Sequence, residues 1–159
     1  MPENRKPRIV LVDDEAMILT SIRTLLTLET DYEVQAFTDP LEAAKYMARN
    51  TVDVTVSDYL MPGMTGIQLL AESKRLQPES TRVLLTGHAD KASAIKAINE
   101  VGLFQYLEKP WDNEQLLLVI QQGVERAQLL GELRQKISEL DAAHSTLKNT
   151  QARLLKAFL

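Results

Sequence analysis

Five short strand-like runs, each followed by a segment with helical periodicity, constrain the fold of this chain more than any other feature of its sequence. The runs lie at residues 8–12, 32–37, 52–58, 82–86 and 104–108. The first is a nearly continuous apolar stretch, which is typical of a strand that is buried on both faces. Strands that alternate with helices form a parallel sheet covered on both faces, because right-handed crossovers leave few alternatives. The sequence therefore predicts a flavodoxin-like, doubly wound α/β fold with strand order 2-1-3-4-5.

Apolar stripes at helical spacing predict which side of each intervening helix faces the sheet. The stripes consist of Ile18, Ile22, Leu25 and Leu26; Leu41, Ala44, Met47 and Ala48; Ile67, Leu70 and Leu76; and Ile95, Ile98 and Val101. Asp39 and Pro40 supply an N-cap and a proline at the first helical position of the second helix. Gly102 is placed to end the fourth helix.

Composition bounds the kind of protein that this chain can be. With 159 residues, 45% hydrophobic and 25% charged, it can bury one sizeable core and has material for an additional segment. It has no cysteine, which excludes disulfides and thiolate metal sites. No stretch approaches the ~18 apolar residues of a membrane span, and a net charge of −4 does not favour direct nucleic-acid binding. We therefore expect a cytoplasmic protein with no membrane or direct nucleic-acid partner.

Polar residues occur where four of the predicted strands end. Asp13 and Asp14 follow the first strand, Asp58 ends the third, Thr86 ends the fourth and Lys109 follows the fifth. In a parallel sheet these ends meet at one rim, where ligands bind. Three carboxylates at one rim repel one another and need a cation, and oxygen ligands suit Mg²⁺. A carboxylate beside a metal, a hydroxyl and an ammonium group forms a site that can accept a phosphoryl group.

The stretch TVDVTVSDYLMPGM at residues 51–64 contains the carboxylate of Asp58 at the end of a predicted strand. Its β-branched residues predict a strand that ends at Asp58, and Pro62 and Gly63 predict the loop that follows. Asp58 is therefore delivered to the sheet edge where chemistry takes place. We expect it to be the nucleophile.

Four motifs give this chain a clear family resemblance. They are VDDE at 12–15, SDYLMPGMTG at 57–66, LTGHAD at 85–90 and EKPW at 108–111. In this order and at these spacings they resemble the CheY-like receiver domain of two-component response regulators, over roughly residues 8–122. The resemblance implies a signalling domain that takes a phosphoryl group from a sensor histidine kinase or a phosphotransfer protein. It implies that the chain is not an enzyme, although slow loss of its own phosphoryl group is expected.

The resemblance also implies roles for particular residues. Asp58 would be the phospho-acceptor, while Thr86 and Lys109 would contact the phosphoryl group. Asp14, Asp58 and the backbone carbonyl of Leu60 would be ligands of Mg²⁺, and Asp13 would contribute directly or through a water molecule. Tyr106 matches the aromatic residue that swings inward when the threonine hydroxyl moves toward the phosphate. The peptide bond before Pro110 is often cis in this family.

The last third of the chain has a different pattern. Helical periodicity begins after Asp112 and continues without proline to the last residue, and apolar residues recur every seven positions beyond residue 129. Leu133, Leu140, Leu147 and Leu154 fit heptad position d, and Leu130, Ile137, His144, Gln151 and Phe158 fit position a. We expect a receiver domain at 1–122 and a helical coiled-coil segment at 123–159 that forms a parallel homodimer. The alternative is a helix that packs against a domain outside this sequence.

Other functions remain open at this point. A phosphatase of the haloacid dehalogenase type also uses an aspartyl nucleophile and Mg²⁺, but that family has a second acid two residues later, where this chain has Leu60. A coiled-coil adaptor with an inert receiver-like head would leave the acidic pocket unexplained. We expect the chain to be a fragment of a longer regulator. Extensions of this kind resemble those that join receivers to HD-GYP phosphodiesterase domains or to kinase dimerisation helices.

Overall fold

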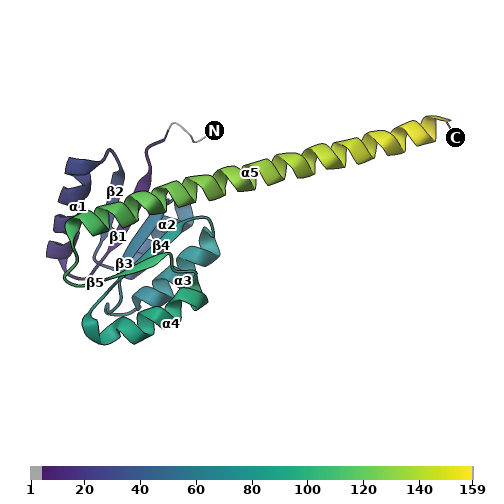
Figure 1. Cartoon of the computed structure of the whole chain (residues 1–159). Helices are drawn as coiled ribbons and strands as arrows, with labels where there is room; N and C mark the ends of the chain where they lie inside the picture. The colour runs from purple at the N-terminus through teal and green to yellow at the C-terminus, as the bar shows by residue number, and fades with distance from the viewer. Residues whose placement is uncertain (1–4, 159) are drawn as a thin grey trace. The chain divides into compact units, whose positions relative to one another are not determined.

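The computed structural model describes residues 5–158, apart from the side chain of His88. The strands are β1 (Arg8–Val12), β2 (Glu33–Phe37), β3 (Val54–Asp58), β4 (Thr81–Thr86) and β5 (Gln105–Glu108). The helices are α1 (Ala16–Glu29), α2 (Pro40–Arg49), α3 (Gly66–Leu76), α4 (Lys91–Val101) and α5 (Asn113–Phe158), with a 3₁₀ turn, η2, at His88–Asp90. The elements follow one another in the predicted alternation (Figure 1).

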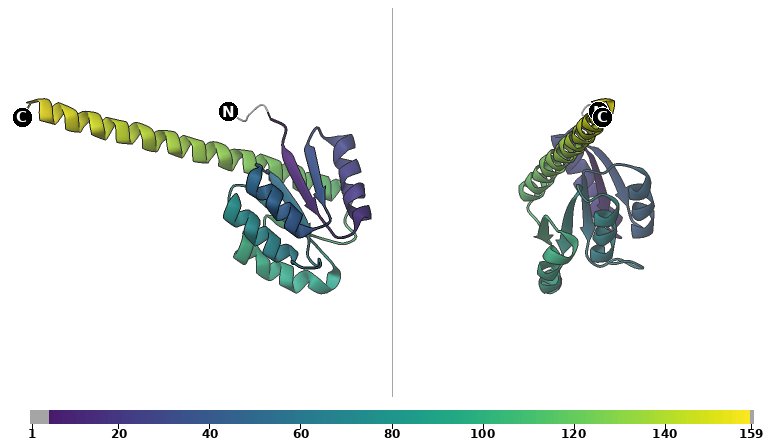
Figure 2. Two further views of the ribbon diagram at one scale, coloured as in Figure 1. Left: turned by 180° about the vertical axis from the view of Figure 1, so that it is seen from behind. Right: turned by 90° about the vertical axis from the view of Figure 1, so that its right-hand side faces the viewer.

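All of the strands are parallel and form one sheet in the order β2-β1-β3-β4-β5, which confirms the predicted topology. Helices α1 and α5 cover one face, and α2, α3 and α4 cover the other, as the two views in Figure 2 show. Residues of β1, β3 and β4 point alternately into the two layers, so these central strands are buried on both faces. The sheet therefore supplies a rigid base for its two rims.

The predicted inner faces of α2 and α4 were partly wrong. Ala94 and Ala97 are buried in α4, whereas Ile95 and Ile98 keep 50% and 39% of their surface exposed. In α2 the buried residues are Pro40, Ala43 and Met47, while Leu41 and Ala48 are exposed. Alanine lets a helix lie close to the sheet, so the smaller residues occupy the point of contact and the larger ones lie beside it. Spacing alone could not distinguish these neighbouring stripes.

The described chain forms two compact units, one that ends at Ala127 and one that begins at Gln128. In the first unit, α5 buries Leu116, Val119 and Ile120 against the sheet. The expected division at residues 122 and 123 stays a prediction, and residues 1–4 and 159 of the expected domains lie outside the described residues. Among residues 5–158, no helix combines the length and the apolar character that a membrane crossing requires.

Candidate functional site

The carboxyl ends of the strands bring the predicted polar residues to one rim of the sheet. Asp58 is the last residue of β3 and pairs in register with Leu85, next to Thr86 at the end of β4. Asp13 follows β1 directly, and Lys109 follows β5. Because parallel strands all point the same way, residues that are far apart in sequence become neighbours here.

Lys109 contacts two of the carboxylates. Its Nζ lies 3.0 Å from Oδ1 of Asp58 and 3.3 Å from Oδ2 of Asp13. Asp13 is almost fully buried and Asp58 keeps only 8% of its surface exposed. The peptide bond from Lys109 to Pro110 is cis, as the resemblance implied. The ammonium group of Lys109 therefore brings a positive charge from the end of β5 to the acidic cluster.

Asp13, Asp14 and Asp58 together form a group that fits a hard metal ion. Each offers one carboxylate oxygen, and these three atoms lie within 4.8 Å of one another. Asp14 is exposed, so the cluster opens to solvent on that side. Oxygen donors with one open side suit Mg²⁺, which keeps several waters and phosphate oxygens in its shell. The residues present therefore fit the expected ion.

The charges of the site act on one another. Burial raises the pKa of Asp13 above 3.8, and the negative charge of Asp58 raises it further, although the backbone N–H of Glu15, which donates to Asp13 at 2.9 Å, opposes this rise. Burial by itself would lower the pKa of Lys109, but its hydrogen bond to Asp58 and the charges of Asp13 and Asp58 outweigh burial and raise it. The site therefore favours the charged form of Lys109, whereas it makes the ionised form of Asp13 less favourable than in a free aspartate.

Thr86 ends β4 and carries a buried side-chain hydroxyl. Its Oγ1 is buried and has no hydrogen-bond partner among the described residues, while its backbone carbonyl accepts from the N–H of Lys109 at 2.8 Å. Buried hydroxyl groups are rarely left unpaired unless they serve another purpose. Tyr106 lies on β5, opposite Leu84, and is half-buried against the α3–α4 side of the core.

The loop after β3 contains a residue whose importance the sequence analysis missed. Gly66, the first residue of α3, donates its N–H to the carbonyl of Tyr59 at 2.8 Å. A Cβ atom at this position would lie 2.1 Å from the backbone oxygen of Asp58, so no side chain fits. Gly66 therefore lets α3 begin directly beneath Asp58. The glycine at the end of the SDYLMPGMTG motif was the available signal.

Leu60, the proposed backbone ligand, lies in the same loop. Its side chain is 59% exposed. The role of its backbone carbonyl as a ligand stays a prediction.

The chain is similar in sequence to known regulatory proteins. Residues 9–121 match the family model described as the response regulator receiver domain. The hydrogenase transcriptional regulatory protein HoxA of Cupriavidus necator is 30% identical over 152 residues, which are 96% of this chain and 31% of that protein. The transcriptional regulatory protein FixJ of Bradyrhizobium diazoefficiens is 27% identical, over 97% of this chain and 74% of that protein. The chain spans less than a third of the length of its first curated relatives.

A solved structure agrees with the sequence relatives. The signal receiver domain of an HD domain-containing protein from Pseudomonas fluorescens Pf-5 has a TM-score of 0.76 and 37% identity. The match covers 81% of this chain and 94% of that structure.

Proposed function

This chain belongs to the response regulator receiver domain family, and from that premise we propose that it accepts a phosphoryl group on Asp58. The donor would be the phosphohistidine of a sensor kinase or of a phosphotransfer protein. The 3.0 Å contact between Lys109 and Asp58, within a cluster of three carboxylates, is the observation that carries the proposal. This contact supports the proposal because a carboxylate and a cation lie together beside the exposed Asp14, where a phosphoryl group could enter.

The side chains at this rim would supply the nucleophile and the groups that contact the transferred oxygens. A carboxylate oxygen of Asp58 attacks phosphorus, so that a P–O bond forms while the P–N bond of the donor breaks. The imidazole leaves with the electron pair and takes up a proton from solvent. Lys109 neutralises charge on the transferred oxygens, and the free hydroxyl of Thr86 can donate to one of them.

We assign the metal ligands to Asp13, Asp14, Asp58 and the backbone carbonyl of Leu60. Bound there, Mg²⁺ would offset the repulsion among the carboxylates and polarise the phosphoryl oxygens. The proximity of three carboxylate oxygens and the raised pKa of Asp13 support this assignment.

Thr86 and Tyr106 form the proposed switch. A hydroxyl that gains a phosphoryl oxygen as a partner would draw the end of β4 toward Asp58. That movement would vacate space for Tyr106, which lies on the adjacent strand and is already half-buried. The response would then appear in β4, β5 and the helices that follow them.

We further propose that the chain dimerises through a parallel coiled coil at residues 130–158. Large apolar residues of the heptad pattern are exposed there, with Leu133, Ile137, Leu140, Leu147 and Leu154 between 51% and 69% exposed, and Leu130 is half-buried. Each leucine would contribute roughly 1.5–3 kcal/mol when a partner helix buries it fully.

The charges and polar residues of the segment specify how the helices would pair. In a parallel pair, Lys136 at position g faces Asp141 at position e of the partner, a contact of the right sign but of small energy. His144 and Gln151 at position a would fix the register.

Labelling with acetyl phosphate tests the phosphorylation proposal. Wild type should gain one phosphoryl group with Mg²⁺ and none in the presence of a chelator. Asp58→Asn, which keeps the side-chain shape and removes the nucleophile, should gain none. Labelling that is independent of Mg²⁺ would contradict the assigned metal site. The family match and strand order favour this function over the haloacid dehalogenase alternative.

A further inference from the structure

The amino ends of β4 and β5 hold one turn of helix α5. Thr81, the first residue of β4, donates its hydroxyl to the backbone carbonyl of Gly123 at 2.7 Å, and this contact is buried. The guanidinium of Arg126 lies over the ring of Phe104, 5.8 Å from the ring centroid, immediately before β5. Nη1 of Arg126 also donates to Oγ1 of Thr81 at 3.4 Å. We call Thr81, Phe104, Gly123 and Arg126 the α5 joint.

Gly123 sets the closeness of this packing. A Cβ atom there would lie 3.0 Å from Cγ2 of Thr81 and 3.1 Å from Cγ2 of Val54. Glycine lowers the stability of a helix interior relative to alanine, so the close approach to the sheet is the physical reason for a glycine at this position. With so little space, α5 cannot slide over β4 without repacking the contact.

The same two strands end at the phosphorylation site. β4 begins at Thr81 and ends at Thr86, whose buried hydroxyl has no partner among the described residues. β5 begins one residue after Phe104 and is followed by Lys109, which contacts Asp58. Each strand therefore has a group at one end that would sense the phosphoryl group and a group at the other end that holds α5.

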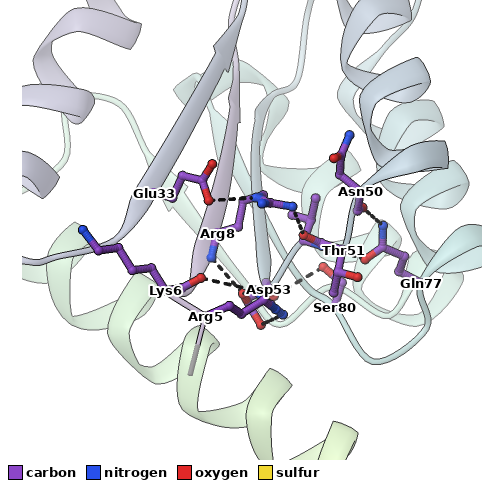
Figure 3. Close-up of polar contacts among 10 residues, drawn as sticks. Arg5, Lys6, Arg8, Glu33, Asn50, Thr51, Asp53, Gln77 and Ser80 are labelled. Carbon is purple, nitrogen blue, oxygen red and sulfur yellow. Dashed lines mark hydrogen bonds and ion pairs between the residues drawn. The ribbon is translucent and has the colours of Figure 1, made fainter. Parts of the chain in front are cut away.

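Asp53, the residue before β3, is the centre of a network of hydrogen bonds and ion pairs at the amino ends of the strands (Figure 3). The carboxylate of Asp53 accepts from Arg5 at 2.7 and 3.1 Å and from the backbone N–H of Arg8 at 2.8 Å. The carbonyl of Asp53 accepts from the N–H of Thr81 at 2.8 Å and from the hydroxyl of Ser80 at 3.3 Å. These bonds tie the start of β3 to the start of β4.

Arg82 completes the anchoring on the opposite face of the sheet. Its guanidinium donates to the carbonyl oxygens of Val101, Gly102 and Gln77, at the ends of α4 and α3. Burial and the charge of Arg126 lower the pKa of Arg82 to about 10, which leaves it charged at neutral pH. Consecutive residues of β4 thus hold α5 on one face and α3 and α4 on the other.

We propose that the α5 joint carries the response from Thr86 and Lys109 to helix α5. This inference rests on the proposed function, because it needs phosphorylation to act on those two residues. A small shift of β4 and β5 would change the Thr81 and Phe104 contacts together. Closely packed contacts of this kind change between discrete arrangements rather than deform continuously, so the part of α5 at residues 113–127 would shift as one piece.

Amide chemical-shift changes on the full chain test the α5 joint, with beryllium fluoride and Mg²⁺ as the phosphate mimic. Thr81→Val removes the hydroxyl and keeps the shape, and Thr81→Ser restores the hydroxyl. Thr55→Val is the matched control, because Thr55 is also a buried strand threonine but its hydroxyl faces the sulfur of Met47 on α2, at 3.5 Å. Gly123→Ala wedges the contact open and tests the joint by a second route.

In wild type, Thr81→Ser and Thr55→Val, the mimic should shift amides at the ends of β4 and β5 and also in α5 at residues 121–127. In Thr81→Val and Gly123→Ala the strand-end shifts should persist while the α5 shifts fall below about half of the wild-type change. Wild-type α5 shifts in Thr81→Val would overturn the inference, as would a wild type whose strands respond and whose α5 does not. A wild type with no response at the strand ends would instead refute the proposed function.

Discussion

The ammonium nitrogen of Lys109 lies 3.0 Å from a carboxylate oxygen of Asp58, so the rim of the sheet pairs its central nucleophile with a cation from another strand. Parallel topology brings about this contact, because β3 and β5 end at the same edge on either side of β4. Asp13 shares the same ammonium group at 3.3 Å.

Replacing Lys109 by methionine should slow phosphorylation without preventing folding. The change keeps an unbranched side chain and removes the charge that would stabilise the transferred oxygens, so we expect a rate lower by about 10²-fold. The rate of label incorporation from acetyl phosphate at fixed Mg²⁺ measures this. Lys45→Met is the control, because Lys45 makes only an exposed pair with Glu42 on α2. Equal rates in wild type and Lys109→Met would contradict the role assigned to Lys109.

Asp13→Asn should stabilise the metal-free protein near neutral pH. Burial raises the pKa of Asp13 in the folded protein above 3.8, the usual value. Below the pKa of the unfolded chain the protonated side chain costs the folded protein nothing. As the pH rises through the folded pKa the side chain ionises, and the folded protein loses stability. The asparagine variant does not suffer this loss. In a chelator it should melt at a higher temperature than wild type near neutral pH, and the difference should shrink below pH 3.8.

Added Mg²⁺ provides the complementary measurement. Ligand binding to the folded state raises the melting temperature, so wild type should gain more from Mg²⁺ than Asp13→Asn. Equal gains would argue against Asp13 as a ligand.

Gly66→Ala should destabilise the protein and impair labelling of Asp58. The added methyl group would meet the backbone oxygen of Asp58 at 2.1 Å, and overpacking of this kind costs about 1–3 kcal/mol. Gly131→Ala is the matched control, since a Cβ atom there meets nothing within 4 Å in a helix interior. That control should stabilise its helix by about 0.5–1 kcal/mol. Denaturant unfolding of both variants checks the pair, and similar effects of the two changes would contradict the close approach at Gly66.

The coiled-coil proposal predicts a difference between two faces of α5. Leu140→Lys with Leu147→Lys, both at position d, should give monomers in sedimentation, because each buried leucine contributes roughly 1.5–3 kcal/mol. Ala142→Lys with Asn149→Lys adds the same charges one heptad apart at position f and should leave the dimer intact. A wild type that remains monomeric at high micromolar concentration would favour a helix that packs against another domain.

The strand pattern predicted the fold and the rim at which the polar residues gather, because the ends of the strands determine both. Five apolar runs fixed where Asp58, Thr86 and Lys109 fall in the sequence, and parallel pairing brought those ends to one rim. Crossover handedness limits the possible strand orders, and the order 2-1-3-4-5 is one of the two that are common in doubly wound sheets.

The details that the sequence could not predict depend on distances between helices and the sheet. Hydropathy did not reveal that Ala94 and Ala97, rather than Ile95 and Ile98, lie in the core. It also gave no reason for Gly66 or Gly123, since a glycine that admits close backbone approach looks the same in sequence as one in a flexible turn. The sequence also did not predict that Asp13 is buried while Asp14 is exposed, because both residues follow the same strand.

The most direct test of the central claim is to identify the residue that carries the phosphoryl group. Wild-type protein treated with acetyl phosphate and Mg²⁺ can be reduced with borohydride, which converts an aspartyl phosphate to homoserine, and then mapped by peptide mass spectrometry. Our account predicts homoserine at residue 58 alone, and no conversion without Mg²⁺. Conversion at Asp13 or Asp14 instead, or phosphorylated protein with Asp58 unmodified, would contradict it.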